Sequence, residues 1–524
     1  MNSFSKQKII VQVTWLFMVL PPFLSIAAYY TLYYHYKYNS ILLLLLLLEP
    51  LHMIYYIALK YYINRYQNLS TLGSVRHTLS NEKRSGIWIK AVDAAHAYNF
   101  EKWYRAWFEN KAIHSIKYED AERFVSWVTF GVFTASSGDL RMYMEEIEKR
   151  TRSITIKENV SNDHHSVTIT REKSSSSLLA TVPLLQNNES PNYETDGITT
   201  SVVEITQKKK PLYAPSLAKV ASIYHPLWFY GLKSCIQFWF ENITLPKVGF
   251  KLFENESITS KLPAHQAGCK MFYRLPAHDG AKERPILLFH GMGAGVTPYL
   301  VIILELIKRF PTRPIFLLYI PQISMTYRME LPPLTDIATL VEAVVLSIMK
   351  PAFSNETVEV DVLGHSLGTC VAVNVMQREK IKCHTVVFAD PAAVSCCLPD
   401  MIKRLFFDDN YQGIFDLIVR TEIHTMYAVQ KRLDWMEAFI GGLGNIHIES
   451  NKQTQILHNS STKNTHVQKF IIYLSSRDMM IPFLSSGRII KRLIPGAIID
   501  NFEGTHGQWL GSSDSVSKYV SALE

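Results

Sequence analysis

One pentapeptide constrains the fold of this chain more than any other feature: Gly-His-Ser-Leu-Gly at residues 364–368. The segment before it, residues 357–363, carries apolar and β-branched residues in alternation, which predicts a buried strand. The residues after Ser366 predict a helix packed on a sheet. Between a strand and a helix, Gly-x-Ser-x-Gly forms a turn so tight that side chains at the flanking positions would collide with neighbouring elements. The sequence therefore predicts that Ser366 is an exposed nucleophile, with a chance glycine-rich turn as the alternative.

From residue 268 onward, predicted strands alternate with predicted helices. This alternation indicates an α/β fold, in which a mostly parallel sheet is covered by helices on both faces. Residues 391–468 interrupt the alternation with a long insertion that contains helical pieces, and we interpret it as a lid. The predicted strands are 269–274, 285–290, 314–320, 357–363, 384–389, 470–474 and 497–502, and the predicted helices are 299–308, 334–349, 366–378, 486–493 and 515–523.

A nucleophilic serine needs a base and an acid that orients the base. On a sheet of this kind the three residues follow one another along the chain as serine, acid and histidine. His506 follows the last predicted strand and is the candidate base, and Asp478 follows the preceding strand and is the candidate acid. Asp390, which follows the strand after the nucleophile, is the alternative acid; its other role would be to cap the next helix.

A second glycine-rich loop, at residues 289–295, leaves another predicted strand. The backbone N–H groups of Met292 in this loop and of Leu367 after the nucleophile are the candidate oxyanion hole. A phosphate-binding loop is the competing interpretation, but the loop lacks both Gly-Lys-Ser/Thr and Gly-x-Gly-x-x-Gly. The six cysteines show neither Cys-x-x-Cys spacing nor a disulfide framework. We therefore expect no metal and no cofactor.

The N-terminal part of the chain is strongly apolar. Residues 9–34 and 41–59, the second with seven consecutive leucines, each approach the ~20 residues of a membrane-spanning helix. Tyrosines flank both segments, as is typical of bilayer interfaces. We predict a transmembrane helical hairpin; a re-entrant hairpin, a cleaved signal peptide and a buried helix pair are the alternatives.

Charge around these segments bears on the compartment. Lysines and arginines flank the hairpin on both sides, which predicts that the termini and the catalytic domain face the cytosol, with the endoplasmic reticulum or lipid droplets as the expected membrane. Glycosylation sequons at Asn68, Asn242, Asn255 and Asn355 favour the lumen instead. The net charge of +8 favours binding to a surface of anionic lipid. The basic residues are too dispersed to form a stripe, which argues against binding to nucleic acid.

We divide the chain into five predicted segments. They are a membrane anchor (1–63), an aromatic helical region (64–152), a disordered polar linker (153–210), an aromatic helical segment (211–267) and the catalytic domain (268–524). The aromatic residues of the second segment recur at helical spacing, so they either pack on the catalytic domain or lie on the membrane surface. Within the linker, residues 201–206 have the pattern of a strand that we do not place.

From about residue 224 the chain resembles the α/β-hydrolase superfamily, and more narrowly the membrane-anchored serine hydrolases found chiefly in fungi. The resemblance rests on ordered motifs: His-Pro-Leu at 225–227, His-Gly-x-Gly-x-Gly at 290–295, Pro-Tyr at 298–299, the serine elbow, Asp-Pro at 390–391, and a final Asp and His. It implies Ser366 as nucleophile, Asp478 as acid and His506 as base. The His-x-x-x-x-Asp acyltransferase pattern of certain lipid-droplet hydrolases is absent after His506.

These observations predict a membrane-bound serine hydrolase that cleaves carboxylic esters of lipids through an acyl-enzyme. The expected partners are a lipid or acyl-ester substrate and a membrane. A lipid acyltransferase or a thioesterase using the same serine is one alternative, and a non-catalytic hydrolase-like membrane scaffold is another. The sequence predicts neither the acyl chain nor the oligomeric state.

Overall fold

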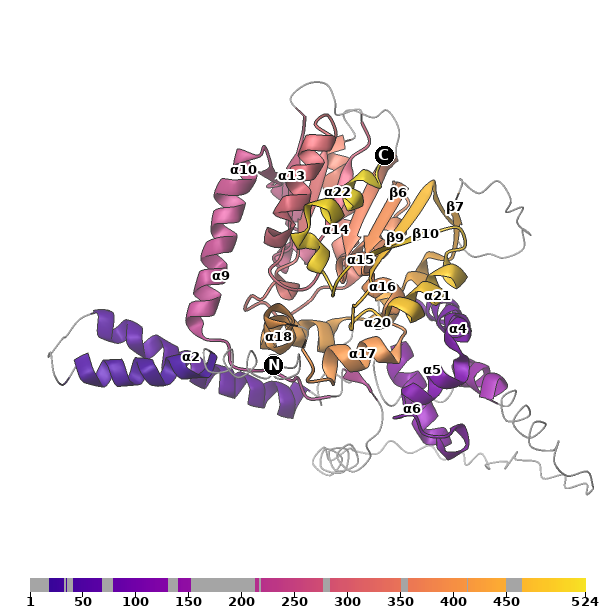
Figure 1. Cartoon of the computed structure of the whole chain (residues 1–524), viewed down its shortest axis with the longest axis horizontal. Helices are drawn as coiled ribbons and strands as arrows, with labels where there is room; N and C mark the ends of the chain where they lie inside the picture. Colours follow the sequence, from indigo (N-terminus) through magenta and orange to yellow (C-terminus); the bar gives the residue numbers. More distant parts are fainter. Residues whose placement is uncertain are drawn as a thin grey trace, which may run out of the picture.

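The computed structural model describes residues 18–32, 34, 41–67, 79–130, 140–151, 213–215, 218–276, 283–349, 357–411, 413–448 and 464–524. The predicted polar linker at 153–210, with its unplaced strand at 201–206, lies outside these residues. Within them, an eight-stranded sheet is the centre of the fold, in the order β1-β2-β4-β3-β5-β6-β9-β10 (Figure 1).

The six strands from β4 to β10 in the sheet order run parallel to one another, whereas β2 pairs antiparallel with both β4 and the edge strand β1. Central strands β3 and β4 are buried along their whole length, because helices cover both faces, and their sequences are accordingly unbroken apolar runs. This confirms the predicted mostly parallel sheet. The strands are β1 (Lys251–Leu252), β2 (Lys270–Arg274), β3 (Ile286–Phe289), β4 (Ile315–Tyr319), β5 (Val358–His365), β6 (Ile381–Ala389), β9 (Lys469–Ser475) and β10 (Ile498–Phe502).

Two hydrophobic cores lie on opposite faces of the sheet. Successive residues of one strand enter different cores, as the period of a β-strand requires: Leu287 belongs to one core and Leu288 to the other. Helices α13 (Leu300–Arg309) and α22 (Ser513–Ser521) cover one face. Helices α14 (Leu334–Met349), α15 (Gly368–Met376) and α21 (Phe483–Leu493) cover the other.

The predicted insertion lies between β6 and β9 and is mainly helical. It reaches the molecule's lower side in Figure 1, below the ends of the strands. Two short parallel strands, β7 (Asn445–Ile448) and β8 (Asn464–Val467), close it. Its helical elements are α16 (Ala392–Ser395), α17 (Pro399–Phe406), α18 (Ile414–Thr421), α19 (Ile423–Tyr427), the π-helix η11 (Ala428–Arg432), α20 (Trp435–Ala438) and η12 (Ile440–Leu443).

The aromatic helices of the N-terminal half pack against this insertion. They are α4 (Asn81–Tyr98), α5 (Phe100–Ala106), α6 (Tyr118–Phe130) and a helix at residues 140–151. The indole N–H of Trp103 donates to the carbonyl of Cys397 at 2.7 Å, and Arg84 pairs with Asp434 at 3.1 Å. Of the two roles predicted for these aromatic residues, the structure therefore shows packing on the catalytic domain.

The first apolar segments are helical at residues 18–32 and in α2 (Ile41–Tyr62), which continues into the π-helix η1 (Ile63–Gln67). Among the residues that the structure describes, no helix meets the length and hydrophobicity that crossing a bilayer requires. The predicted transmembrane hairpin is thus not supported by this finding. The carboxylate of Glu49 is buried and accepts the backbone N–H of Leu227 at 3.0 Å, at the start of α9 (Leu227–Trp239).

Short helical turns join the remaining elements. They are η3 (Ile113–Ser115), η6 (Phe240–Thr244), α10 (Leu245–Lys247), α11 (Glu256–Thr259), α12 (Pro263–Gln266), η8 (Thr297–Tyr299), η9 (Pro321–Ile323) and η13 (Gln508–Gly511).

Candidate active site

Ser366 occupies a strained turn between β5 and α15. Its φ of 51° lies in the left-handed region, which residues other than glycine rarely adopt. A Cβ on Gly368 would lie 2.4 Å from the carbonyl oxygen of Phe289, so this position admits only glycine. A Cβ on Gly364 would lie 3.2 Å from the ring of Phe388, a tight contact. The geometry is that of a nucleophile elbow.

The structure brings the three predicted triad residues together at one end of the sheet. Nε2 of His506 lies 2.9 Å from the Ser366 hydroxyl, and Nδ1 lies 2.6 Å from Oδ2 of Asp478. Asp478 is in turn held by the backbone N–H groups of Met480 and Ile481, at 2.7 and 2.9 Å. Because the backbone holds one carboxylate oxygen of Asp478, the other oxygen is fixed in position to orient the imidazole of His506.

The electrostatic environment favours the charged form of His506. Burial alone would lower its pKa, but the charge and hydrogen bond of Asp478, with a smaller effect of Asp390, raise the pKa to about 9. An imidazolium is the form that appears when the histidine has accepted the serine proton. The carboxylates thus stabilise the state that proton transfer from Ser366 creates.

Asp390, the alternative acid, lies next to the triad. Among the hydrogen bonds of the described residues, none joins Asp390 to the imidazole of His506. Its carboxylate accepts the N–H and the hydroxyl of Ser475 at 2.7 and 2.8 Å, and the N–H of Gly507 at 3.3 Å. Burial and the charge of Asp478 raise its pKa to about 6. Asp390 therefore ties the loop that carries Asp478 to the loop that carries His506, and it does not cap α16, whose N-cap is Pro391.

Asp390, Asp478 and His506 are the one group of three potential metal ligands found close together among the described residues. Their ligand atoms lie within 4.8 Å of one another. Each of these carboxylate oxygens and ring nitrogens already has a hydrogen-bond partner in the protein. The donor set consequently fits a proton-transfer network better than a metal centre.

The glycine-rich loop after β3 is pressed against the nucleophile. A Cβ on Gly291 would lie 2.9 Å from the Cβ of Ser366. The N–H of Ile320 donates to Nε2 of His290 at 3.1 Å, which leaves the proton on Nδ1 to donate to the carbonyl of Gly291 at 2.7 Å. Burial lowers the pKa of His290 to about 4, which keeps it neutral in this role.

Tyr299 joins the loop to the elbow, a function that the sequence analysis did not assign. Its hydroxyl accepts the N–H of Gly291 at 2.6 Å and lies 2.6 Å from Nδ1 of His365, the residue before the nucleophile. The only sequence signal was its place in the Pro-Tyr pair. Met292 and Leu367, the candidate oxyanion donors, line the same cavity as Ser366.

A cavity of about 390 Å³ opens above Ser366 and His506. The insertion contributes part of its wall through α17, α18 and η11. Asp416 and Arg420 of α18, paired at 3.4 Å, bring charge to this wall, which the sequence pattern did not predict. The larger apolar side chains of the lining are Met292, Leu367, Met401, Leu405, Val419, Val429, Met480, Ile481 and Leu510.

The sheet order, with its nucleophile turn after β5, defines an α/β-hydrolase fold. Neither a protein-family model nor a curated protein matches this chain. Among solved structures, the chain is similar to carboxylesterase CesB from Bacillus subtilis (13% identity, 56% of this chain and 96% of that one, TM-score 0.33). It is also similar to carboxyl esterase 2 from the mycorrhizal fungus Tuber melanosporum (15%, 63% and 99%, 0.34) and to a bromoperoxidase from Bacillus anthracis (15%, 49% and 95%, 0.30).

These similarities do not distinguish the membrane-anchored fungal group within the superfamily, so that finer resemblance stays a prediction. All three identities lie below 25%. The roles of Ser366, His506 and Asp478 therefore rest on the geometry of this chain's own site.

Proposed function

We propose that this chain is a membrane-associated serine hydrolase that cleaves carboxylic esters with apolar acyl groups, as found in lipids. One observation carries the proposal: a strained serine lies 2.9 Å from a histidine that is held 2.6 Å from a buried carboxylate. The apolar cavity above these residues supports an acyl chain as the group that binds there.

The mechanism assigns one role to each residue. Ser366 attacks the ester carbonyl, and His506 takes the hydroxyl proton through Nε2 while its Nδ1–H donates to Asp478. The N–H groups of Met292 and Leu367 stabilise the oxyanion, and losing one such donor typically costs ~2.7–4 kcal/mol of transition-state stabilisation. His506 then protonates the leaving alcohol, and a water molecule repeats the sequence on the acyl-enzyme.

Membrane association is supported by the apolar segments at residues 9–34 and 41–59, and its proposed orientation by the lysines and arginines around them. We place the catalytic domain on the cytosolic side, as that charge distribution predicts. An enzyme at a bilayer would meet lipid esters at high local concentration.

The test is a series of p-nitrophenyl esters of increasing acyl length, hydrolysed by the full chain, by Ser366→Ala and by a surface control, Asp514→Asn. The proposal predicts that wild type and the control hydrolyse them, with kcat/KM rising with chain length, and that Ser366→Ala does not. Adding an alcohol or a thiol separates the alternatives. Transfer of most of the acyl group to the alcohol would identify an acyltransferase. A preference for thioesters over esters would identify a thioesterase. The absence of any turnover would identify a non-catalytic scaffold.

A further inference from the structure

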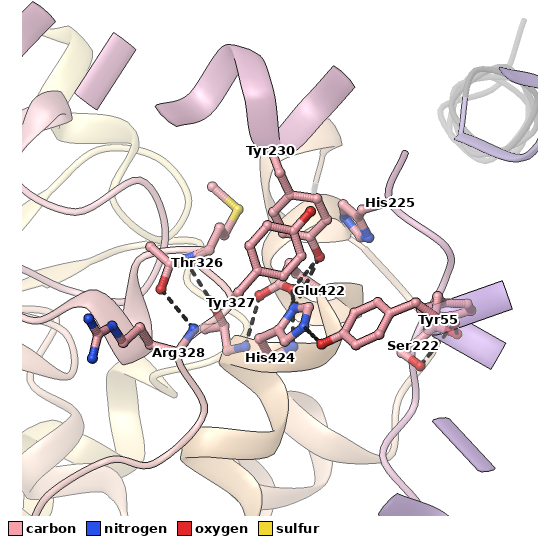
Figure 2. A network of polar contacts seen from close by, with 12 residues as sticks. Tyr55, Ser222, His225, Tyr230, Thr326, Tyr327, Arg328, Glu422 and His424 are labelled. Atoms are coloured by element: carbon pink, nitrogen blue, oxygen red, sulfur yellow. Dashed lines mark hydrogen bonds and ion pairs between the residues drawn. The ribbon is translucent and has the colours of Figure 1, made fainter. Parts of the chain in front are cut away.

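Helix α9 turns its polar side chains toward the protein. Tyr230 and Gln237, two helical turns apart, are its buried residues. The Tyr230 hydroxyl donates to the carboxylate of Glu422 at 2.6 Å, and Lys233 reaches the hydroxyl of Tyr319 at 3.4 Å. Figure 2 shows Tyr230 pointing down from its helix into the polar cluster around Glu422. Polar contacts, and not an apolar stripe, therefore hold α9 on the domain.

The opposite side of α9 is apolar and exposed. Trp228 is 48% exposed, Leu232 54%, Ile236 48% and Trp239 61%. At 100° per residue, all four lie on the side of the helix away from Tyr230. A surface helix of a soluble domain shows the reverse arrangement, with its apolar stripe toward the core. The exposed stripe is thus not explained by the fold itself.

Helix α2 shows the same inverted arrangement, with polar side chains toward the protein and apolar side chains outward. Its inward residues are polar: Glu49 accepts the hydroxyl of Tyr224 at 2.7 Å, and Lys60 donates to the carbonyl of Ser222 at 2.7 Å. His52 contributes a further contact, 3.1 Å from the hydroxyl of Tyr224. On the outward side the exposed large residues include Leu51, Ile54 and Ile57.

The two helices with outward apolar faces adjoin at the start of α9, and their outward apolar residues are together called the surface below. Glu49 of α2 accepts the N–H of Leu227, the first residue of α9, so the helices are joined by a direct bond. In Figure 1, α2 lies at the foot of α9, and both stand at the margin of the molecule, away from the sheet. Their outward apolar residues together exceed the isolated exposed hydrophobics that a soluble surface normally carries.

The chemistry of this surface fits lipid better than a protein partner. Trp228 and Trp239 stand at the two ends of the exposed stripe of α9, and tryptophan is enriched at the bilayer interface. An exposed cation follows each helix in the sequence, Arg65 after α2 and Lys247 after α9, and both charges complement anionic headgroups.

We infer that the outward faces of α9 and α2 lie together in the interfacial layer of a lipid bilayer. This inference rests on the proposed membrane association and is independent of the ester chemistry. Because Tyr230 on the inner side of α9 bonds to Glu422 at the start of α19, the surface places the insertion that covers the active site next to the lipid.

The protein contains its own reporter for this test. Cys235 lies on the outward side of α9 and is the cysteine, among six, that is exposed. The full chain, labelled there with an environment-sensitive fluorophore, is reconstituted in vesicles of phosphatidylcholine and phosphatidylserine with or without nitroxide-bearing lipid. The inference predicts a blue shift and strong quenching by the nitroxide lipid. The matched control carries the label on Ser513→Cys in a Cys235→Ser background, at an exposed position on the catalytic domain, and should show neither.

Three results would overturn the inference. A label at Cys235 that stays water-exposed in vesicles would show that the surface is not covered. A label shielded from water yet insensitive to lipid nitroxide would indicate a protein occupant, and self-quenching that grows with protein density would indicate a second copy of this chain. A Leu232→Glu/Ile236→Glu variant should lose the quenching while its hydrolysis of a short soluble ester is unchanged. If wild type hydrolyses no ester but is quenched, the proposed function fails and this inference stands.

Discussion

Asp390 and Asp478 illustrate how two carboxylates in one site take different roles at the scale of single residues. Asp478 contacts the imidazole of His506 at 2.6 Å, whereas Asp390 contacts backbone and hydroxyl groups on either side of it. The first is placed to hold the tautomer of the histidine. The second is placed to hold the two loops together and adds negative charge nearby.

Substituting each carboxylate should separate these roles. Asp478→Asn removes the negative charge and can present an amide N–H to Nδ1, which favours the wrong tautomer of His506, and we expect kcat to fall about 10³–10⁴-fold. Asp390→Asn should cost far less. Because the charge of Asp390 raises the pKa of His506, its removal should move the acidic limb of the kcat/KM profile to lower pH. If Asp390→Asn is as inactive as Asp478→Asn while the control Asp514→Asn has normal activity, the result would identify Asp390 as the acid.

Glycine is required at position 368 of the elbow and is not required at position 487 of α21. A Cβ on Gly368 would meet the carbonyl oxygens of Phe289 and His290 at 2.4 and 2.6 Å, both on backbone that cannot yield. Gly368→Ala should therefore destabilise the protein by about 1–3 kcal/mol or more and abolish activity. Gly487→Ala in α21, where the nearest atom is 3.9 Å away, should instead stabilise by about 0.5–1 kcal/mol. Chemical denaturation measures both, and equal effects would contradict the packing described here.

At the scale of elements, the polar cluster of Figure 2 organises the start of α19. Glu422 accepts the N–H groups of His424 and Thr425 at 3.0 and 2.8 Å and caps the helix. It also accepts the hydroxyl of Tyr230 from α9. One buried carboxylate thus joins the insertion to a helix that lies nearly 200 residues earlier in the chain.

This arrangement predicts a dependence of stability on pH. Burial alone would raise the pKa of Glu422, but the hydrogen bond and charge of His424 hold it at about 2, below the unfolded value of 4.5. The stabilisation is therefore present above pH 4.5 and is lost as the pH falls from there toward 2. Glu422→Gln should cost about 1.5–3 kcal/mol at pH 7 and less at pH 4.

Denaturant titrations at the two pH values measure this difference. Glu330→Gln, which breaks an exposed ion pair with Arg432, is the control and should change the free energy of unfolding by about 0–1 kcal/mol. A cost for Glu422→Gln that does not change with pH would show that packing, and not charge, holds the cluster.

At the scale of the whole molecule, the N-terminal aromatic helices are part of one structure with the catalytic domain. Arg84 of α4 forms a buried pair with Asp434 at the start of α20, and it also donates to the carbonyl of Thr129 in α6. The two charged side chains are 2% and 9% exposed, so water does not replace a lost partner.

Removing this link should destabilise the whole chain. We expect Arg84→Met to cost about 3–5 kcal/mol, because it leaves the Asp434 carboxylate buried without its cation. Arg141→Met, which breaks an exposed pair with Glu145, should cost about 0.3–0.5 kcal/mol. A double variant with Asp434→Asn should be less destabilised than the sum of the two single changes. Additive costs would show that the two residues do not interact in solution.

Much of the sheet is predictable from the sequence because its signals are local. Strands such as β3 and β4 are buried on both sides, so each appears as a short apolar run, and all seven strands predicted between residues 269 and 502 are present. The positions of Ser366, Asp478 and His506 were predictable for a related reason: each follows a recognisable strand. The carboxyl ends of parallel strands lie at one edge of the sheet, so the three residues come together there.

The features that the sequence did not predict depend on contacts between distant residues. Tyr55 of α2 and His424 of α19 are 369 positions apart, and no local pattern connects them. The inward polar face of α2 has the same origin: its leucines predict an apolar helix, but only the tertiary structure shows that Glu49 caps α9. Short elements such as α19 and β1 are likewise determined by their neighbours and not by their own sequence.

The central claim, that Ser366 is an activated nucleophile, is tested most directly by a fluorophosphonate probe, which reacts with a serine only when a base activates it. The full chain and Ser366→Ala are incubated with the probe, and the modified residue is located by mass spectrometry. We predict that wild type is labelled on Ser366 and that Ser366→Ala is not labelled. Equal labelling of the two proteins, or a label found on another residue, would contradict the account.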